Sequence, residues 1–128
     1  MISTVAIYVR LSLEDDDLFH GKTESESITN QRDLLTAYIR NSPDRAHAGT
    51  QECCDDGYSG KNFDRPGVKA LLEAARNGEI QCIVVKDLSR FGRDYITVGN
   101  YVSRVFPFLG IRFIAVNDHF DSSRKGDI

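Results

Sequence analysis

The residues with the clearest chemical potential lie in the segment YVRLS, residues 8–12. Side chains alternate along a strand, so Tyr8, Arg10 and Ser12 would share one face if the strand continued that far. The planar fork of a guanidinium matches a phosphate, and an anion held by Arg10 would place its phosphorus near the Ser12 oxygen. On spacing alone, a strand-end serine beside a solvated arginine is the simpler interpretation.

A second polar cluster follows a buried apolar run further along the chain. Arg90 and Arg93 are three residues apart, which on a helical turn places both guanidinium groups on one side. Gly92 between them permits close approach of the backbone. The simpler interpretation is a charged helix start with Asp87 or Ser89 as its cap.

A third polar segment is a turn-forming stretch, residues 56–60, which leads to Arg65 at the start of an expected helix. A helix N-terminus attracts anions, and an adjacent arginine strengthens that attraction. A loop followed by an ordinary helix cap explains the same residues equally well. Asp55 or Asp56 could approach the site, and either could instead pair with Arg65.

The pattern of apolar residues predicts the elements that position these segments. Short runs rich in branched residues predict strands, and apolar residues with helical spacing predict helices. Strands are expected at residues 4–10, 50–54, 80–85 and 111–116, and helices at residues 27–41, 66–77 and 94–109. The rest is expected to be an acidic loop, a polar loop or irregular turn, and a loose polar end, at residues 11–26, 86–93 and 117–128.

This alternation predicts an α/β fold, with a mainly parallel central sheet of about four to five strands and helices on both faces. In such sheets chemistry collects at the carboxyl ends of the strands. The three polar segments each follow an expected strand, so we expect them to converge at one edge of the sheet.

In this order and spacing, the three segments resemble the catalytic domain of the serine recombinases, which include resolvases, invertases, large serine integrases and transposon recombinases. The resemblance spans about residues 4–116 and rests on YVRLS, SITNQRDLL and DDGYSGKNFDRPGVKALLEAARNGEIQCIVVKDLSRFGRD. The string DLSRFGRD and the long acidic loop after the serine are most similar to the large, transposon-borne branch.

The resemblance implies catalytic roles for one serine and a group of arginines. Ser12 matches the nucleophile. The arginines that match those around the scissile phosphate are Arg10, Arg65, Arg90 and Arg93. The reaction that it implies is site-specific DNA recombination through a 5′-phosphoseryl intermediate, in which one half of a tetramer rotates against the other before the strands are rejoined without ATP.

The resemblance also implies supporting residues. Gln31 matches a polar helix residue near the active site, and Tyr8 belongs to the first motif, where a packing role is expected. Many relatives place an aspartate directly before the first arginine of the last motif. Here Ser89 occupies that position and Asp87 lies two residues earlier, which leaves a carboxylate role there open.

No metal-binding spacing occurs, so no metal or cofactor is expected, and the arginines would stabilise the charge on the phosphoryl oxygens. No proton acceptor is identified, because the three histidines, His20, His47 and His119, lie outside every motif. We expect them to be surface residues.

Composition limits what the chain does alone. Its 128 residues suit one domain, and its net charge is −3, with −6 on residues 1–64 and +3 on residues 65–128. The resemblance implies that residues 1–128 are a catalytic-domain fragment that lacks the oligomerisation helix and the DNA-binding domains, and the acidic balance agrees with this expectation. The expected partners of the full-length protein are double-stranded recombination sites and its own copies, as a dimer or tetramer.

The cysteines and the hydropathy of the chain favour the cytoplasm. The three cysteines have neither metal-binding nor disulfide spacing, and no apolar run is long enough to span a membrane.

Two other interpretations remain open from the sequence. A catalytically inert module that binds nucleic acid or a partner could use the same fold. A phosphorelay receiver domain has a similar length, with acidic residues after the first strand and Asp87 after a later one. The last expected strand lacks the lysine that a receiver would place after it.

Overall fold

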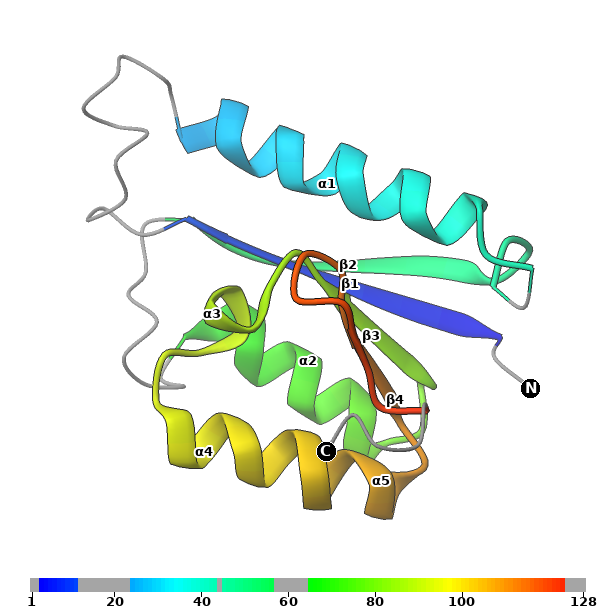
Figure 1. The fold of residues 1–128 in the computed structure, drawn as a ribbon, viewed down its shortest axis with the longest axis vertical. Helices are drawn as coiled ribbons and strands as arrows, with labels where there is room; N and C mark the ends of the chain where they lie inside the picture. The colour runs from blue at the N-terminus through cyan, green and yellow to red at the C-terminus, as the bar shows by residue number, and fades with distance from the viewer. Residues whose placement is uncertain (1–2, 12–23, 44, 57–64, 124–128) are drawn as a thin grey trace.

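The computed structural model of the chain describes residues 3–11, 24–43, 45–56 and 65–123 (Figure 1). A five-stranded sheet with the order β2-β1-β3-β4-β5 forms its centre. Its strands are β1 (Thr4–Leu11), β2 (Gly49–Asp56), β3 (Cys82–Val85), β4 (Arg112–Ala115) and β5 (Phe120–Asp121). The first four strands are parallel to one another, and β5 pairs antiparallel with β4.

Helices cover both faces of this sheet. Helix α1 (Glu24–Arg40) lies on one face, and α2 (Pro66–Arg76), α4 (Tyr95–Asn100) and α5 (Phe106–Leu109) lie on the other (Figure 1). Between β3 and α4 the chain forms a single helical turn, α3 (Leu88–Phe91). The predicted α/β class and mainly parallel sheet are therefore confirmed.

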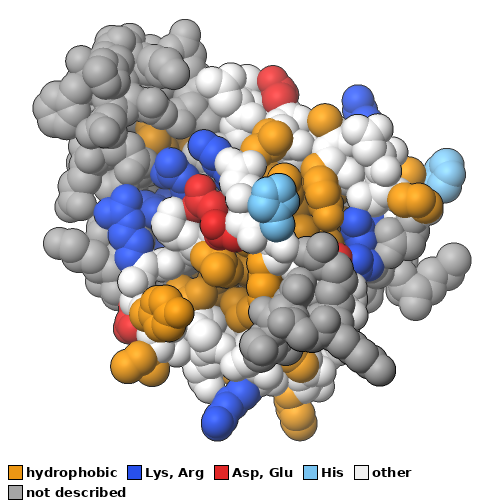
Figure 2. Space-filling view, viewed as in Figure 1, with side chains coloured by type: hydrophobic (Ala, Val, Ile, Leu, Met, Phe, Trp, Pro, Cys, Tyr) orange, Lys and Arg blue, Asp and Glu red, His pale blue; other side chains and the backbone are white. Residues whose placement is uncertain are grey.

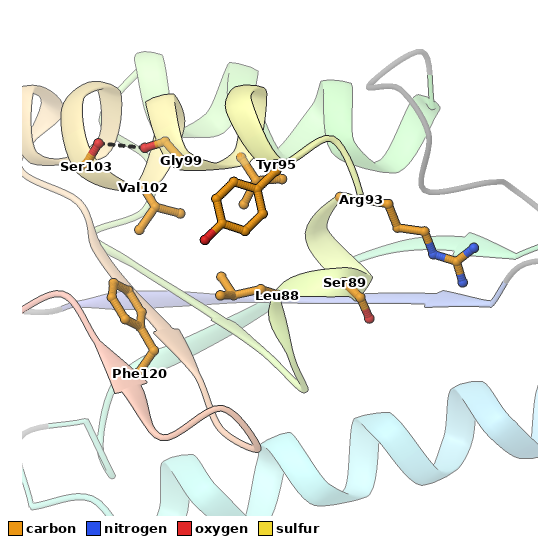
Figure 3. A pocket seen from close by; sticks show the side chains of 10 residues that line it. Leu88, Ser89, Arg93, Tyr95, Gly99, Val102, Ser103 and Phe120 are labelled. Atoms are coloured by element: carbon orange, nitrogen blue, oxygen red, sulfur yellow. Dashed lines mark hydrogen bonds between the residues drawn. The ribbon is translucent and has the colours of Figure 1, made fainter. Parts of the chain in front are cut away.

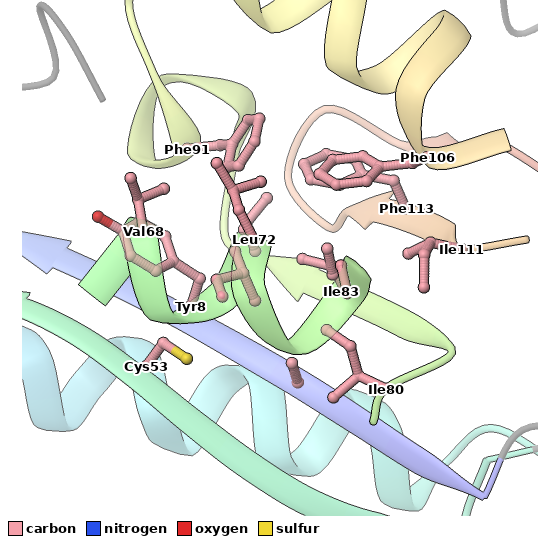
Figure 4. Close-up of a cluster of buried hydrophobic side chains, with 14 of the residues drawn as sticks. Tyr8, Cys53, Val68, Leu72, Ile80, Ile83, Phe91, Phe106, Ile111 and Phe113 are labelled. Atoms are coloured by element: carbon pink, nitrogen blue, oxygen red, sulfur yellow. The ribbon is translucent and has the colours of Figure 1, made fainter. Parts of the chain in front are cut away.

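Side chains alternate along β1 and divide the core into two layers. Val5, Ile7 and Val9 are buried in a cluster that includes residues of α1, whereas Ala6 and Tyr8 are buried in the cluster beneath α2, α4 and α5 (Figure 4). The alternation that places Tyr8 on the α2 side places Arg10 on that side as well.

The ends of the helices follow from local chemistry. Pro66 begins α2, where its missing N–H costs no hydrogen bond, and Gly78 follows the end of the helix with a φ of 74°. Gly110 ends α5 in the left-handed conformation, with a φ of 75°.

Four parts of the chain differ from the expected elements. Helix α1 begins at Glu24, within the segment expected to be an acidic loop. The segment expected to be a polar loop or irregular turn contains α3. The helix expected at residues 94–109 contains a π-helical turn, Tyr101–Val105, where the Phe106 N–H bonds to the Tyr101 carbonyl and the next residue, Pro107, has no N–H to donate. The expectation of a loose end after residue 116 is wrong for β5, where the Asp121 carboxylate accepts a 2.9 Å hydrogen bond from Arg112 Nε.

No helix in the described ranges is long and apolar enough to cross a membrane.

Candidate active site

The candidate site lies where β1, β2 and β3 end. Arg10 of β1 and Asp55 of β2 are opposite each other in the sheet and are 0% and 1% exposed. Arg65, 1% exposed, precedes α2, and α3 follows β3. Residues far apart in the sequence therefore meet at one edge of the sheet, as expected for the carboxyl ends of parallel strands.

The helical turn α3 holds two of the expected arginines. Arg10 donates from Nε to the Arg90 carbonyl at 3.0 Å and from Nη2 to the Ser89 carbonyl at 2.8 Å. Arg65 donates from Nη2 to the Phe91 carbonyl at 2.6 Å and from Nη1 to the Arg90 carbonyl at 3.5 Å. The last carbonyls of a helix have no partner within the helix and carry partial negative charge, so they suit guanidinium donors.

The backbone of Arg10 is also held from two sides. The Gln31 side chain accepts from the Arg10 N–H at 3.2 Å and donates to the Arg10 carbonyl at 3.0 Å. Arg90 donates from Nη1 to the same carbonyl at 3.1 Å. Gln31 and Arg90 therefore fix the end of β1 two residues before Ser12, which lies outside the described residues.

Tyr8 and Asp55 support Arg65. The Tyr8 hydroxyl accepts from Arg65 Nη1 at 2.7 Å and donates to Asp55 Oδ2 at 2.7 Å. Burial raises the pKa of Tyr8 well above its ordinary value, and the hydrogen bond to Asp55 raises it further. Tyr8 contributes to packing, as expected, but it also links a carboxylate to an arginine.

Asp55 occupies the N-terminus of α2. Its carboxylate accepts from the Gly67 N–H at 2.7 Å and from the Val68 N–H at 3.0 Å. The expected attraction of that helix N-terminus for an anion is therefore used by a carboxylate of the chain itself. The sequence leaves open whether Asp55 approaches the site or pairs with Arg65; in the structure it caps α2 and is linked to Arg65 through the Tyr8 hydroxyl.

Positive charge dominates the surroundings of Arg10. The acceptors of the Arg10 and Arg65 side chains named above are all uncharged: main-chain carbonyls and a hydroxyl. Burial is the largest of the effects that lower the pKa of Arg10 to about 10, and the charges of Arg65 and Arg90 come next. Such a cluster is suited to bind an oxyanion and to stabilise charge that develops on it.

The other predicted site residues lie at the rim. Arg93 is exposed, and its charge also lowers the pKa of Arg10 (Figure 3). Asp87 caps α3, since its Oδ1 accepts from the Arg90 N–H at 3.1 Å and from the Ser89 hydroxyl at 2.6 Å. Asp87 therefore orients the helical turn that carries Arg90.

An apolar groove of about 610 Å³ begins beside Ser89 and Arg93 and continues along α4 (Figure 3). Its apolar lining comes from α3, α4, the π-helical turn and β5: Leu88, Tyr95, Val98, Val102 and Phe120. The face drawn in Figure 2 shows a group of basic side chains above exposed hydrophobic ones. Tyr95 and Ile96 are 92% and 83% exposed.

The structure thus brings three predicted arginines, Arg10, Arg65 and Arg90, into one hydrogen-bonded group with Tyr8 and Gln31. It places Arg93 at the edge of that group. The turn at residues 57–60 and His20 lie outside the described residues, while His47 and His119 are exposed.

Comparison with known proteins gives a consistent family. A family model described as "Resolvase, N terminal domain" matches residues 5–127. No curated protein gave a match to the sequence.

Several solved structures share the fold. The N-terminal catalytic domain of TP901-1 integrase is 28% identical with a TM-score of 0.75, over 95% of this chain and 83% of that one. A resolvase family site-specific recombinase from Streptococcus pneumoniae is 23% identical with a TM-score of 0.70, over 96% and 78%. The C-terminal catalytic domain of ISC1926 TnpA, an IS607-like serine recombinase, is 21% identical with a TM-score of 0.67, over 88% and 70%.

Proposed function

The chain belongs to the resolvase N-terminal domain family, and we propose that it is the catalytic domain of a serine-type site-specific DNA recombinase. The observation that carries this proposal is the gathering of Arg10, Arg65 and Arg90 at the end of β1. A strand end that leads directly into Ser12 and is surrounded by guanidinium groups suits a phosphodiester held beside a hydroxyl.

In the proposed reaction the Ser12 oxygen attacks the phosphorus of one DNA strand. The bond to the 3′ oxygen breaks, the serine loses its proton, and the leaving 3′ oxygen gains one. The products are a 5′-phosphoseryl linkage and a free 3′ hydroxyl. Since the energy of the phosphodiester is kept in the new linkage, attack by a 3′ hydroxyl rejoins the strands without ATP.

The arginines supply the electrostatic part of this reaction. Arg10 and Arg65 are held by α3 before any DNA arrives, so their donors need no reorganisation when charge grows on the phosphoryl oxygens. Arg90 both touches the end of β1 and provides a carbonyl for Arg10. Arg93 is exposed at the rim, and in this proposal it would contact the DNA backbone.

We also propose that most of the DNA affinity of the full-length recombinase resides outside residues 1–128. A net charge of −3 gives this chain little attraction for a polyanion. The full-length protein would act as a dimer or tetramer on double-stranded sites. A gel-shift assay on the 128-residue chain is expected to show weak binding, and tight site-specific binding would contradict this.

The test of the proposed function is to trap the covalent intermediate. The full-length recombinase is incubated with its site, and the protein–DNA adduct is digested and sequenced. We expect a DNA-linked peptide that contains Ser12 and loss of the adduct in Ser12→Ala. An adduct that forms equally in Ser12→Ala would rule out Ser12 as the nucleophile, whereas no cleavage by a folded wild-type protein would support an inert binding module instead.

A further inference from the structure

The turn between β4 and β5 is tied to the start of α3. The Asn117 N–H donates to the Lys86 carbonyl at 2.7 Å. The Leu88 N–H donates to the Asp118 carboxylate, also at 2.7 Å, although the two residues are 30 positions apart in the sequence. The chain that follows β4 therefore returns to the end of β3 and holds the first residue of α3 (Figure 1).

Asp118 supplies an acceptor that the N-cap of α3 cannot supply. The first N–H groups of a helix have no partner within the helix, and an N-cap side chain reaches only the second or third of them. Asp87 follows this rule, since its Oδ1 accepts from the Arg90 N–H at 3.1 Å. The Leu88 N–H comes first and lies beyond the reach of that cap, so its acceptor comes from elsewhere in the fold, as Asp118 Oδ2.

The other end of α3 carries the acceptors of the arginine cluster. The carbonyls of Ser89 and Arg90 accept from Arg10. The Phe91 carbonyl accepts from Arg65. A helical turn of four residues has little stability of its own, because helix nucleation is unfavourable, so tertiary contacts must hold it. Carboxylates at its start and guanidinium groups at its end are the charges that a helix dipole favours, and both sets of contacts therefore support the same conformation.

We propose that Asp118 is a positioning residue for DNA cleavage: by holding the first residue of α3, it places the carbonyls that orient Arg10 and Arg65. This inference rests on the proposed function and adds to it a residue of the β4–β5 turn that acts through α3. A carboxylate that only stabilised the fold would raise the melting temperature and leave the arginines of the folded molecule unaffected. The two roles therefore differ in the behaviour of Arg10.

Three substitutions separate these roles. Asp118→Ala removes the acceptor of the Leu88 N–H. Asp118→Asn removes the charge but keeps a carbonyl oxygen that can accept the same hydrogen bond. Asp33→Ala is the matched control, because it removes one negative charge from an exposed position on α1, which covers the face of the sheet opposite α2. Asp118 is itself exposed, so its variants are expected to fold.

The primary readout is the rotation rate of the Arg10 guanidinium about its Nε–Cζ bond, measured by ¹⁵N NMR on this chain. In the wild type, Nε and Nη2 donate to adjacent carbonyls of α3, at 3.0 and 2.8 Å, so rotation is expected to be slow. Asp118→Ala should speed it about threefold or more, because α3 loses a hydrogen bond to a charged acceptor. Small domains unfold far more slowly than such a rotation occurs, so a simple loss of stability would leave this rate unchanged.

The second readout is DNA cleavage by the full-length protein, at a temperature where the thermal unfolding curve of each variant shows it folded. We expect cleavage to fall about threefold or more in Asp118→Ala and to stay at the wild-type rate in Asp33→Ala. Asp118→Asn should lie closer to the wild type than to Asp118→Ala in both readouts, since it retains the acceptor.

The outcomes that overturn the proposal are specific. An unchanged Arg10 rotation rate in Asp118→Ala would overturn it, and so would cleavage by that variant at the wild-type rate. Asp118→Asn as impaired as Asp118→Ala would assign the effect to the charge and refute the role of the hydrogen bond.

The two readouts also separate this proposal from the proposed function. Faster Arg10 rotation in Asp118→Ala, with a folded wild-type protein that cleaves no DNA, would refute the proposed function and with it a role in cleavage. Normal wild-type cleavage with an Arg10 that does not respond to Asp118→Ala would refute the positioning role alone.

Discussion

Two regions of the molecule use arginine in opposite ways. At the β4–β5 edge, Arg112 is paired with the carboxylate of Asp121. At the carboxyl ends of β1 and β3, Arg10 is fully buried, its side chain donates to the carbonyls of Ser89 and Arg90, and the charges of Arg65 and Arg90 lower its pKa. The Arg112 guanidinium is held by a carboxylate, and that of Arg10 is held by main-chain carbonyls of α3.

The pKa values of the two regions record this difference. Burial alone would raise the pKa of Asp121, but hydrogen bonds from Arg112 and Ser123 bring it well below its ordinary value. Burial, followed by the charges of the neighbouring Arg65 and Arg90 guanidinium groups, lowers the pKa of Arg10 to about 10. The first arrangement stabilises the fold. The second concentrates like charges at a cost in stability, which is typical of a site built for an anion.

The largest effect is expected from the gathered arginines. Arg90→Ala should reduce DNA cleavage by the full-length protein by about 10²-fold or more, since it removes a group that stabilises transition-state charge. The measurement is the single-turnover cleavage rate, and the control is Arg104→Ala, which changes an exposed arginine of the π-helical turn that does not line the groove. Cleavage within a factor of two or so of wild type in Arg90→Ala would end the distinction between the two regions.

The paired arginine should affect stability instead. Arg112→Ala leaves the Asp121 carboxylate, which is 7% exposed, without its guanidinium and should lower the free energy of unfolding by about 1–3 kcal/mol. Urea denaturation of the 128-residue chain measures this. Cleavage by the full-length variant should stay near wild type below its melting temperature. A loss of cleavage comparable to that of Arg90→Ala would show that both arginines serve the same site.

Acid should weaken the β4–β5 edge in particular. Folding depresses the pKa of Asp121 from its ordinary value of 3.8. The ionised Asp121 carboxylate therefore stabilises the fold fully above about pH 3.8, and this stabilisation is lost as the pH falls from there toward the pKa of the folded state. The free energy of unfolding should therefore fall more steeply between about pH 5 and pH 2 in the wild type than in Asp121→Asn. Equal slopes for the two proteins would remove the role assigned to this ion pair.

The smallest effect is expected away from both regions. Lys69 is exposed on α2, and Lys69→Ala should change the free energy of unfolding by less than about 0.5 kcal/mol and leave cleavage unchanged. Thermal unfolding and the same cleavage assay measure both. A clear loss of cleavage would extend the functional surface onto the outside of α2.

The sequence predicts the fold well where one pattern dominates. Branched apolar runs identify β1 and β3, and Pro66 and Gly78 mark the ends of α2 within a residue or two. The antiparallel strand β5 escapes prediction because it is two residues long and depends on the pairing of Asp121 with Arg112 across nine residues. A local pattern carries no signal of such a tertiary ion pair.

For the candidate site, the residue types were predictable and their connections were not. The convergence of Arg10, Arg65 and Arg90 follows from strand order and from the resemblance to serine recombinases. That α3 would supply the acceptors could not be predicted, because any sequence has main-chain carbonyls and only the fold directs them. Asp55 was ambiguous for the same reason, since its partners are a tyrosine far away in sequence and two backbone N–H groups. The catalytic role of Ser12 stays a prediction.

The most direct test is to titrate dimethyl phosphate, a minimal phosphodiester, into the ¹⁵N-labelled chain and follow the arginine Nε–Hε signals. We expect the signals of Arg10, Arg65 and Arg90 to shift together with one dissociation constant while that of Arg112 stays in place. Shifts limited to exposed arginines such as Arg104, or equal shifts for Arg112 and Arg10, would contradict a phosphodiester site at the end of β1.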